Sequence, residues 1–571
     1  MRVAWRLIRI YFVSQEKASA WLLAAGILAL NLANVYISTR INGWNYDFYN
    51  ALQGFRSDEL VGLLGYFAVL VGSAITISVY AVYLKQMLQI RWRRWLTNRY
   101  LVNWMNDQAY YHLELGSLTD NPDQRISEDL DNFTNFFLNL TVGFISSVVS
   151  LFSFLAILWA LSGSADIPIG RWASIHIPAY LLWAALIYAS IGTWLAVRLG
   201  RPLVTLNFLK QKNEADFRYS LVRFRENAES IAFYRGEANE QRHLDIRFSN
   251  IAHTFGQIMK RTRLLTGYTL GYNQVGAIAP LIVVSPRYFA RQIGWGGLMQ
   301  VVNAFSYVQN ALSFIVNSYQ DIALWEAAAQ RLSTFDEHLA ETQEYARERD
   351  QIELRRSGRR VVVSDLELSL PNGRQLLRGV NFSVAPGDSL LITGPSGAGK
   401  STILRAMAGI WPFGKGRINL GDSQILFVPQ RAYLPLGPLL DALTYPAVNM
   451  DEAVFRPALD VLEMVGLGVL KKEINIADNW SRRLSLGEQQ RLAFARILLL
   501  RPTLLLMDEI TSALDERAET ELFGLLEQPR WRPTIISVGH RATLIPLHNR
   551  VLDISDFRVR SENPELAKAV S

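Results

Sequence analysis

The chain has 571 residues, more than the roughly 250 to 300 that one hydrophobic core supports, so we expect at least two domains. Half of its residues are hydrophobic and 19% are charged, which is apolar for a soluble protein and ordinary for a chain partly embedded in a membrane. The net charge of +7 does not indicate nucleic-acid binding, because lysine and arginine gather beside apolar runs, and the absence of cysteine excludes disulfides, cysteine-ligated metals and thiol chemistry.

Long apolar runs occupy the chain before residue 325. A helical membrane span needs about 20 apolar residues. The first run follows three arginines and is too long for the core of a signal peptide, so we interpret it as the first span. We predict six spans, at 19–38, 60–84, 135–161, 176–198, 264–284 and 298–322.

Basic residues are concentrated in the loops that follow the second and fourth predicted spans, whereas the other loops are shorter and less basic. The positive-inside rule places both basic loops in the cytoplasm, and an even number of spans returns the chain there. The sequence after the spans is charged and helical in pattern, and then alternates strand-like and helix-like runs. We therefore predict a membrane domain at 1–330, a linker at 331–360 and a soluble α/β domain at 361–571.

A phosphate-binding loop is predicted between the apolar run 389–393 and a helix-like stretch. Its glycines let backbone N–H groups surround phosphates at a helix N-terminus, while Lys400 reaches the β and γ phosphates and the Ser401 hydroxyl binds Mg²⁺. A chance glycine-rich turn does not explain strand, loop and helix in this order. The candidate nucleotide-binding residues are Gly394, Pro395, Ser396, Gly397, Ala398, Gly399, Lys400, Ser401 and Thr402.

Two adjacent carboxylates follow the apolar run 504–507. Taken alone, such a pair is more often a solvated turn, but its distance downstream of a phosphate loop favours a catalytic role. Asp508 is suited to bind Mg²⁺ through water, and Glu509 is suited to polarise the attacking water as general base.

The segment Leu484-Ser485-Leu486-Gly487-Glu488-Gln489-Gln490-Arg491 resembles the signature of ABC ATPases. Other family marks follow the expected order, with Gln430 in the Q-loop, Asp515 in the D-loop and His540 as the switch histidine. The resemblance implies that ATP and Mg²⁺ are bound between the phosphate loop of one subunit and Ser485 and Gly487 of a second copy. It also implies that Gln430 assists catalysis and, with Ser401 and Asp508, binds the metal. Because the catalytic residues are complete, we expect a homodimer.

This sequence departs from the family pattern at two places. The usual signature, Leu-Ser-Gly-Gly-Gln, has Leu486 and Glu488 here, which we expect to alter packing near the γ phosphate. The aromatic residue that normally stacks on adenine is replaced by Leu370.

Three stretches of the membrane domain resemble ABC subfamily D transporters and their bacterial BacA/SbmA-like relatives: 42–53, 121–126 and 214–237. The last two fall in the basic loops, where the resemblance implies coupling helices that dock onto the cassettes. The implied fold is a membrane all-α domain of six helices in the exporter-type arrangement, joined to an α/β phosphate-loop domain that binds nucleotide.

Polar residues recur at spacings of three and four along the sixth predicted span, which puts them in one stripe on a helix. Such a stripe at membrane depth either lines a hydrophilic translocation path or joins neighbouring helices by hydrogen bonds, and both interpretations stay open. The stripe consists of Asn303, Ser306, Asn310, Ser313, Asn317 and Gln320.

The sequence therefore predicts an ATP-driven transporter in a bacterial inner membrane, with its cassette in the cytoplasm and with lipid, solute and a second copy as partners. The resemblance points to peptides or cobalamin-like molecules, moved inward. Three alternatives remain: export or acyl-CoA transport, a membrane-anchored regulatory ATPase without cargo, and transport driven by a proton gradient.

Overall fold

The computed structural model describes residues 2–115, 121–169, 173–348, 352–447, 454–527 and 531–558. It divides into two compact units, one of Met1–Asn103 with Asn121–Glu337 and the other of Trp104–Asp120 with His338–Ser571. Residues 349–351 of the predicted linker and 559–571 of the predicted soluble domain lie outside the described residues. The predicted boundaries at 330 and 360 stay predictions.

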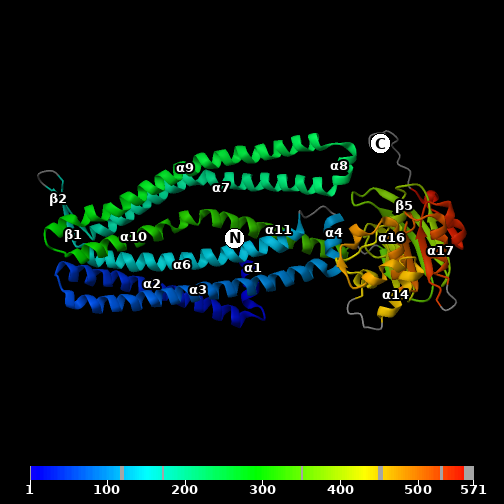
Figure 1. Ribbon diagram of the computed structural model, residues 1–571, viewed down its shortest axis with the longest axis horizontal. Coiled ribbons are helices and arrows are strands. Elements are labelled where there is room, and N and C mark those ends of the chain that lie inside the picture. The colour runs from blue at the N-terminus through cyan, green and yellow to red at the C-terminus, as the bar shows by residue number, and fades with distance from the viewer. Residues whose placement is uncertain are drawn as a thin grey trace. The chain divides into compact units, whose positions relative to one another are not determined.

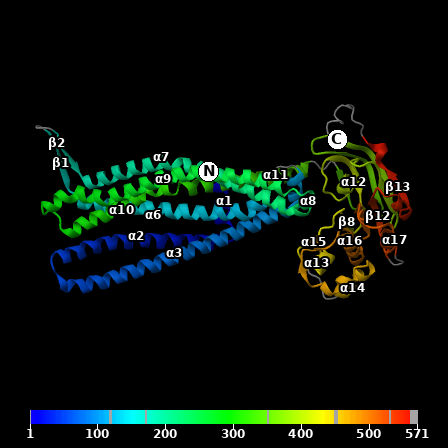
Figure 2. The same ribbon diagram turned by 45° about the horizontal axis from the view of Figure 1, so that its top comes forward.

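The first unit is a bundle of long helices, which run side by side in both views (Figures 1 and 2). Short helical segments connect some of them: α5 (Pro122–Gln124), the π-helical turn η2 (Arg125–Asp129) and α8 (Ala228–Tyr234). The long helices are α2 (Lys17–Gln53), α3 (Ser57–Met105), α6 (Leu130–Ser162), α7 (Tyr180–Glu226), α9 (Glu237–Phe289), α10 (Trp295–Asn317) and α11 (Tyr319–Glu348), preceded by the shorter α1 (Arg2–Val13).

Helices occupy the first, second, third and fifth predicted spans completely and most of the fourth and sixth. Among the described residues, four helical stretches are long and apolar enough to cross a membrane: Lys17–Gln53, Ser57–Leu115, Pro122–Ser162 and Tyr180–Glu226. The helices α9 and α10, at the fifth and sixth predicted spans, fall short of that apolarity. At 1.5 Å per residue the 53 residues of α9 extend for about 80 Å, far beyond a hydrocarbon core of about 30 Å, so a large part of α9 lies outside any membrane.

Two details differ from the sequence analysis. The predicted loop at 162–175 carries an antiparallel hairpin of β1 (Ser164–Ile169) and β2 (Ala173–Pro178). The predicted sixth helix is interrupted at Ser318, so α10 ends before it and Gln320 belongs to α11. The stretch 121–126 lies in the first unit, and its docking on a cassette stays a prediction. The preceding α4 (Ala109–Leu115) groups with the second unit, where Leu115 packs against the cassette core.

The second unit contains a five-stranded parallel sheet in the order β13-β6-β12-β11-β8, and a four-stranded sheet in the order β3-β7-β4-β5. All residues of β11 and β12 are buried, as expected for central strands covered on both faces. The parallel strands are β6 (Ser389–Thr393), β8 (Ile425–Val428), β11 (Leu504–Asp508), β12 (Thr534–Val538) and β13 (Arg550–Asp553). The other sheet has β3 (Ile352–Arg355), β4 (Val361–Ser369), β5 (Gln375–Val384) and β7 (Gly414–Asn419).

Helices pack beside these sheets and supply much of the core. The helix α16 contributes the most to it, because eight of its residues are buried. The main helices of this unit are α12 (Lys400–Met407), α13 (Leu439–Thr444), α14 (Phe455–Met464), α15 (Trp480–Arg483), α16 (Leu486–Leu500) and α17 (Glu516–Gly524).

A buried carboxylate joins two parts of the first unit that are distant in sequence. Asp129, at the end of η2, is 2% exposed and accepts a hydrogen bond of 2.7 Å from Arg125 and one of 2.8 Å from Arg331 on α11. A π-helical turn is rare and often marks a functional position, and here it brings Arg125 and Asp129 together. Since a buried charge is tolerated only when it is paired, this cluster fixes α11 against the start of α6.

We expect Asp129→Asn to destabilise the bundle by about 3 to 5 kcal/mol, because it leaves two arginines without their buried counter-charge. The control is Asp131→Asn, two residues away, whose carboxylate is 40% exposed and pairs with Arg93. That exposed pair is worth about 0 to 1 kcal/mol. Thermal unfolding in detergent measures both, and equal losses in the two variants would contradict the assignment.

Candidate nucleotide site

Four neighbouring strands of the parallel sheet each end at a predicted functional residue. Gly394 follows β6, His540 lies two residues after β12, Glu509 follows β11, and Gln430 lies two residues after β8. The carboxyl ends of parallel strands share one edge of the sheet, which is where α/β folds bind ligands. The sheet order therefore brings together residues that are up to 146 positions apart, from 394 to 540.

The predicted phosphate loop is a backbone cradle at the start of α12. Gly394, Gly397 and Gly399 have positive φ of 145°, 72° and 99°, a region that side chains disfavour. A Cβ at Gly394 would lie 2.9 Å from the side chain of Ile554, so a larger residue does not fit there. Pro395, Ser396 and Gly397 are exposed at the tip of the loop, whereas Ala398, Lys400 and Thr402 are buried. The glycines of the loop thus leave its backbone N–H groups open to a ligand.

Charged groups meet behind this loop. Lys400 Nζ donates hydrogen bonds of 2.9 Å to the carbonyl oxygens of Gly394 and Pro395. The Ser401 hydroxyl donates to Asp508 Oδ1 at 2.8 Å. Burial lowers the pKa of Lys400, against the opposing effect of Glu509 and Asp508, and burial raises the pKa of Asp508, against the hydrogen bond from Ser401. Ser401 and Asp508 offer adjacent oxygen atoms, the donor type that Mg²⁺ prefers.

Glu509 is held between two neighbouring loops. Gln430 Nε2 donates to Glu509 Oε2 at 3.0 Å, and His540 Nε2 lies 2.7 Å from Glu509 Oε1. The backbone of Glu509 is in the left-handed region, with φ of 46°, and its N–H donates to the Val538 carbonyl. Such strain in a residue other than glycine is concentrated at functional sites. The structure therefore brings together the three predicted catalytic residues Gln430, Glu509 and His540.

The signature segment begins α16 with a reciprocal cap. The Ser485 hydroxyl accepts from the Glu488 N–H, while the Glu488 carboxylate accepts from the N–H and the hydroxyl of Ser485 at 2.9 Å and 2.8 Å. The anionic Glu488 is thus turned toward its own helix N-terminus, where the helix dipole favours negative charge. Ser485 and Leu486 are both exposed, and a Cβ at Gly487 would lie 3.3 Å from the Ala513 carbonyl oxygen.

Two residues that the sequence analysis missed restrain the D-loop. Gln490 bonds through its amide to the Ser512 hydroxyl and to the Ala513 N–H. Arg541, next to His540, donates to the carbonyl oxygens of Ser512 and Leu514. Asp515 then caps α17 by accepting from the Ala518 N–H. The position of Arg541 beside the switch histidine was a signal that could have identified it.

Leu370, at the position expected to face adenine, is partly buried against the core of the four-stranded sheet. Its backbone N–H donates to the Arg374 carbonyl at 2.8 Å, in a turn between β4 and β5. Its role toward the base stays a prediction.

The polar stripe lies away from the packed side of α10. Val301, Ala304, Phe305 and Val308 are buried in a cluster of the first unit, whereas Asn310, Asn317 and Gln320 are exposed and Asn303, Ser306 and Ser313 are partly exposed. The Ser306 hydroxyl donates to a carbonyl of its own helix. Within the described residues, no side chain of the stripe makes a hydrogen bond to another helix.

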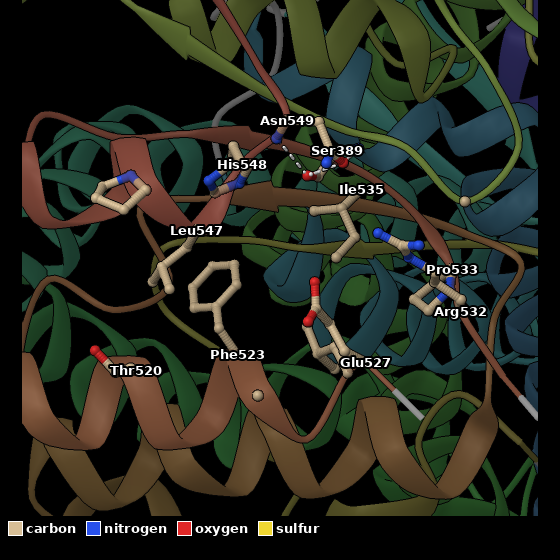
Figure 3. A pocket seen from close by; sticks show the side chains of 14 residues that line it. Ser389, Thr520, Phe523, Glu527, Arg532, Pro533, Ile535, Leu547, His548 and Asn549 are labelled. Carbon is tan, nitrogen blue, oxygen red and sulfur yellow. Dashed lines mark hydrogen bonds between the residues drawn. The ribbon is translucent and has the colours of Figure 1, made fainter. Parts of the chain in front are cut away.

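A cavity of about 320 Å³ lies at the opposite, amino-terminal edge of the parallel sheet and contains no predicted site residue (Figure 3). Phe523, Ile535 and His548 line it together with Glu527 and Arg532 (Figure 3). His548 is buried, with Nε2 2.9 Å from the Ser537 hydroxyl and Nδ1 2.8 Å from the Leu544 carbonyl. Burial lowers the pKa of His548, so this imidazole serves the fold as a neutral group.

Comparison with known families gives matches to both parts of the chain. Residues 7–289 match the family described as ABC transporter transmembrane region 2, and residues 377–512 match the family described as ABC transporter. The structure is also similar to a bacterial Atm1-family ABC exporter with ATP bound, with a TM-score of 0.72 and 19% identity over 95% of each chain. This similarity confirms the predicted fold class.

Relatives match along nearly the whole chain. The Arabidopsis thaliana ABC transporter D family member 2 is 36% identical and covers 95% of this chain and 85% of its own length. The Escherichia coli inner membrane ABC transporter ATP-binding protein YddA is 33% identical over 96% of each chain. The human lysosomal cobalamin transporter ABCD4 is 26% identical and covers 96% of this chain and 94% of its own length.

The buried His548 predicts a pH dependence of stability. Its pKa is lower in the folded protein than the value of about 6.5 in an unfolded chain, so the folded state binds this proton more weakly. The contribution of the neutral His548 to the free energy of unfolding is complete above about pH 6.5 and is lost as the pH falls below this value. We expect the unfolding temperature of His548→Gln to depend less on pH than that of the wild type between about pH 7.5 and 5.5. The exposed His243→Gln is the control, and identical pH profiles for all three proteins would refute the prediction.

Proposed function

The chain belongs to the ABC transporter family, among its D-family and YddA-like half transporters, and on this premise we propose that two identical copies hydrolyse ATP to move a hydrophilic or amphipathic solute across a bacterial inner membrane. The cassette is an ATPase coupled to transport. The observation that carries the proposal is Glu509, held by Gln430 and His540 at the same sheet edge as the phosphate loop.

The residues of the phosphate loop fit the triphosphate of ATP. The glycine cradle from Gly394 to Gly399 supplies backbone N–H groups, and Lys400 supplies positive charge. Ser401, Asp508 and Gln430 would hold Mg²⁺, which would neutralise charge on the phosphates. Glu509 would accept a proton from the attacking water, and His540, at 2.7 Å, would fix the orientation of its carboxylate.

A second copy would complete each site. Ser485 caps α16, Gly487 lies in its first turn, and Asp515 is exposed in the restrained D-loop, so all three are available to a partner. Both the signature and the catalytic residues are present in this chain, which supports a homodimer with two equivalent sites. In this proposal the chain is a multi-pass protein of the inner membrane with its cassette in the cytoplasm.

For cargo, we favour peptides or cobalamin-like molecules moved inward. The exposed stripe of α10 would line the hydrophilic path, because its described side chains are not engaged in helix pairing. One relative is named as a cobalamin transporter, which supports a large polar solute. A transport assay in vesicles also tests the alternatives. Transport of acyl-CoA would be detected with acyl-CoA as the ligand, and export would be detected as movement in the opposite direction.

We expect Glu509→Gln to reduce ATP hydrolysis by roughly 10²- to 10⁴-fold, because the amide cannot accept the proton. The assay uses the purified protein in lipid, with and without peptides and cobalamin. The control is Glu521→Gln, an exposed residue of the same domain that pairs with Arg517. Hydrolysis at the wild-type rate in Glu509→Gln would exclude this residue as the base, and transport that persisted in this variant but stopped with an uncoupler would exclude ATP as the driving force.

We expect the double substitution Asn310→Leu and Asn317→Leu to reduce transport of a polar solute into vesicles while basal ATP hydrolysis continues. The leucines remove two exposed polar groups from the proposed path without touching the buried face of α10. Ile315→Leu, an exposed apolar position of the same helix, is the control. Full transport by the double variant would disprove the path, and hydrolysis that never responds to any solute would favour a regulatory ATPase.

A further inference from the structure

The N-terminal helix α1 packs across α2, α3 and α6. These helices enclose an apolar cavity of about 530 Å³, within the range that small ligands occupy. The lining side chains include Ile8 and Phe12 of α1, Leu28 of α2 and Val142 of α6. Arg9 is the only charged residue among the described lining residues.

The position of α1 follows from its amphipathic sequence. Leu7, Ile8 and Tyr11 are buried, with Tyr11 stacked 5.5 Å from Trp92 of α3, whereas Trp5 and Arg9 on the other face are exposed. A helix of 12 residues is about 18 Å long, too short to cross a bilayer. A short helix with arginines on one face and apolar residues on the other is typical of one lying in the plane of the membrane surface.

The walls of the cavity are fixed by further contacts. Trp21 of α2 donates from its indole N–H to the Phe12 carbonyl at 3.2 Å, and its ring lies 5.2 Å from that of Phe12. Trp5 and Trp21 are 65% and 62% exposed. Tryptophan at such positions is enriched where lipid headgroups meet acyl chains. The cavity therefore extends from the headgroup level into the apolar layer.

Arg9 differs from the neighbouring arginines in its contacts. Arg6 pairs with Asp336 at 2.8 Å, and Arg91 donates to the Ser19 hydroxyl. Arg9 makes no ion pair with any described residue, although it is exposed at the rim of the cavity. A single cation above an apolar cavity is complementary to one anionic group that carries a hydrocarbon tail.

We propose that this cavity, called the α1 groove, binds one acyl chain of an anionic phospholipid whose phosphate pairs with Arg9. The lipid comes from the leaflet on the side of the two basic loops. This is the cytoplasmic leaflet under the membrane orientation proposed above. The groove is separate from the polar stripe of α10, and its occupant is a resident lipid and not cargo.

The test measures phosphatidylglycerol retained by the full chain after purification in detergent supplemented with this lipid, by mass spectrometry of the protein–lipid complex. We expect Arg9→Gln to retain roughly five-fold less, since one basic residue near a membrane surface contributes about that factor. Ala25→Phe, which fills the groove from α2, lowers retention while leaving Arg9 in place. Lys17→Gln, an exposed cation outside the lining, retains as much as the wild type.

Three results would overturn the proposal. Equal retention of phosphatidylglycerol by Arg9→Gln and the wild type would show that Arg9 does not contact the phosphate. If the wild type retained phosphatidylcholine as well as phosphatidylglycerol, the groove would not select an anionic headgroup. Since the chain has no cysteine, a single cysteine at the groove residue Leu28 that forms a disulfide-linked dimer in the membrane would show that a second copy covers the groove. None of these measurements uses ATP hydrolysis or cargo, so this proposal and the proposed function can fail separately.

Discussion

The hydrogen bonds that hold Glu509 between Gln430 and His540 depend on a single constraint, the parallel order of β6, β12, β11 and β8. Each strand delivers one functional loop to the same edge, and the strands are buried so that their spacing cannot change without loss of the core. The left-handed backbone of Glu509 is tolerated because this surrounding structure fixes it. The geometry of this candidate site therefore follows from packing of the sheet and not from the loops alone.

Much of this candidate site could be predicted from sequence, because several of its residues lie at or just after the end of an apolar run that forms a strand. Gly394, Glu509 and His540 mark such positions, and a phosphate loop constrains which chemistry they serve. The restraints on the D-loop could not be predicted in the same way. Gln490 and Arg541 act through backbone carbonyls and amides of residues about 20 to 30 positions away. The place of Arg541 next to His540 indicates that it lies near the site, but the sequence does not show which backbone groups it contacts.

The helices of the bundle were predicted less completely than the site, since hydropathy identifies only helices that are apolar enough to face lipid. The helices α9 and α10 carry many polar residues and still lie at the predicted positions, because their packed faces are apolar: Val284, Leu298 and Val308 are buried together. The interruption at Ser318 has no glycine or proline to announce it. It separates α10 from α11, where ion pairs of Arg331 and Asp336 add to the apolar packing of buried residues such as Phe335.

The hydrogen bonds of Glu488 give a physical account of one of the two departures from the usual signature. An anionic Glu488 beside a phosphate-binding serine would be expected to repel the γ phosphate, yet its carboxylate is committed to the N–H and hydroxyl of Ser485. The bond from the Ser485 N–H, together with the bond from the Glu488 N–H to the Ser485 hydroxyl, closes a capping box that strengthens the first turn of α16, where a negative charge is favourable. The same contacts hold Ser485 in one orientation at the surface. Of the two altered signature residues, Glu488 is therefore engaged within its own helix cap, whereas Leu486 is 55% exposed at the surface.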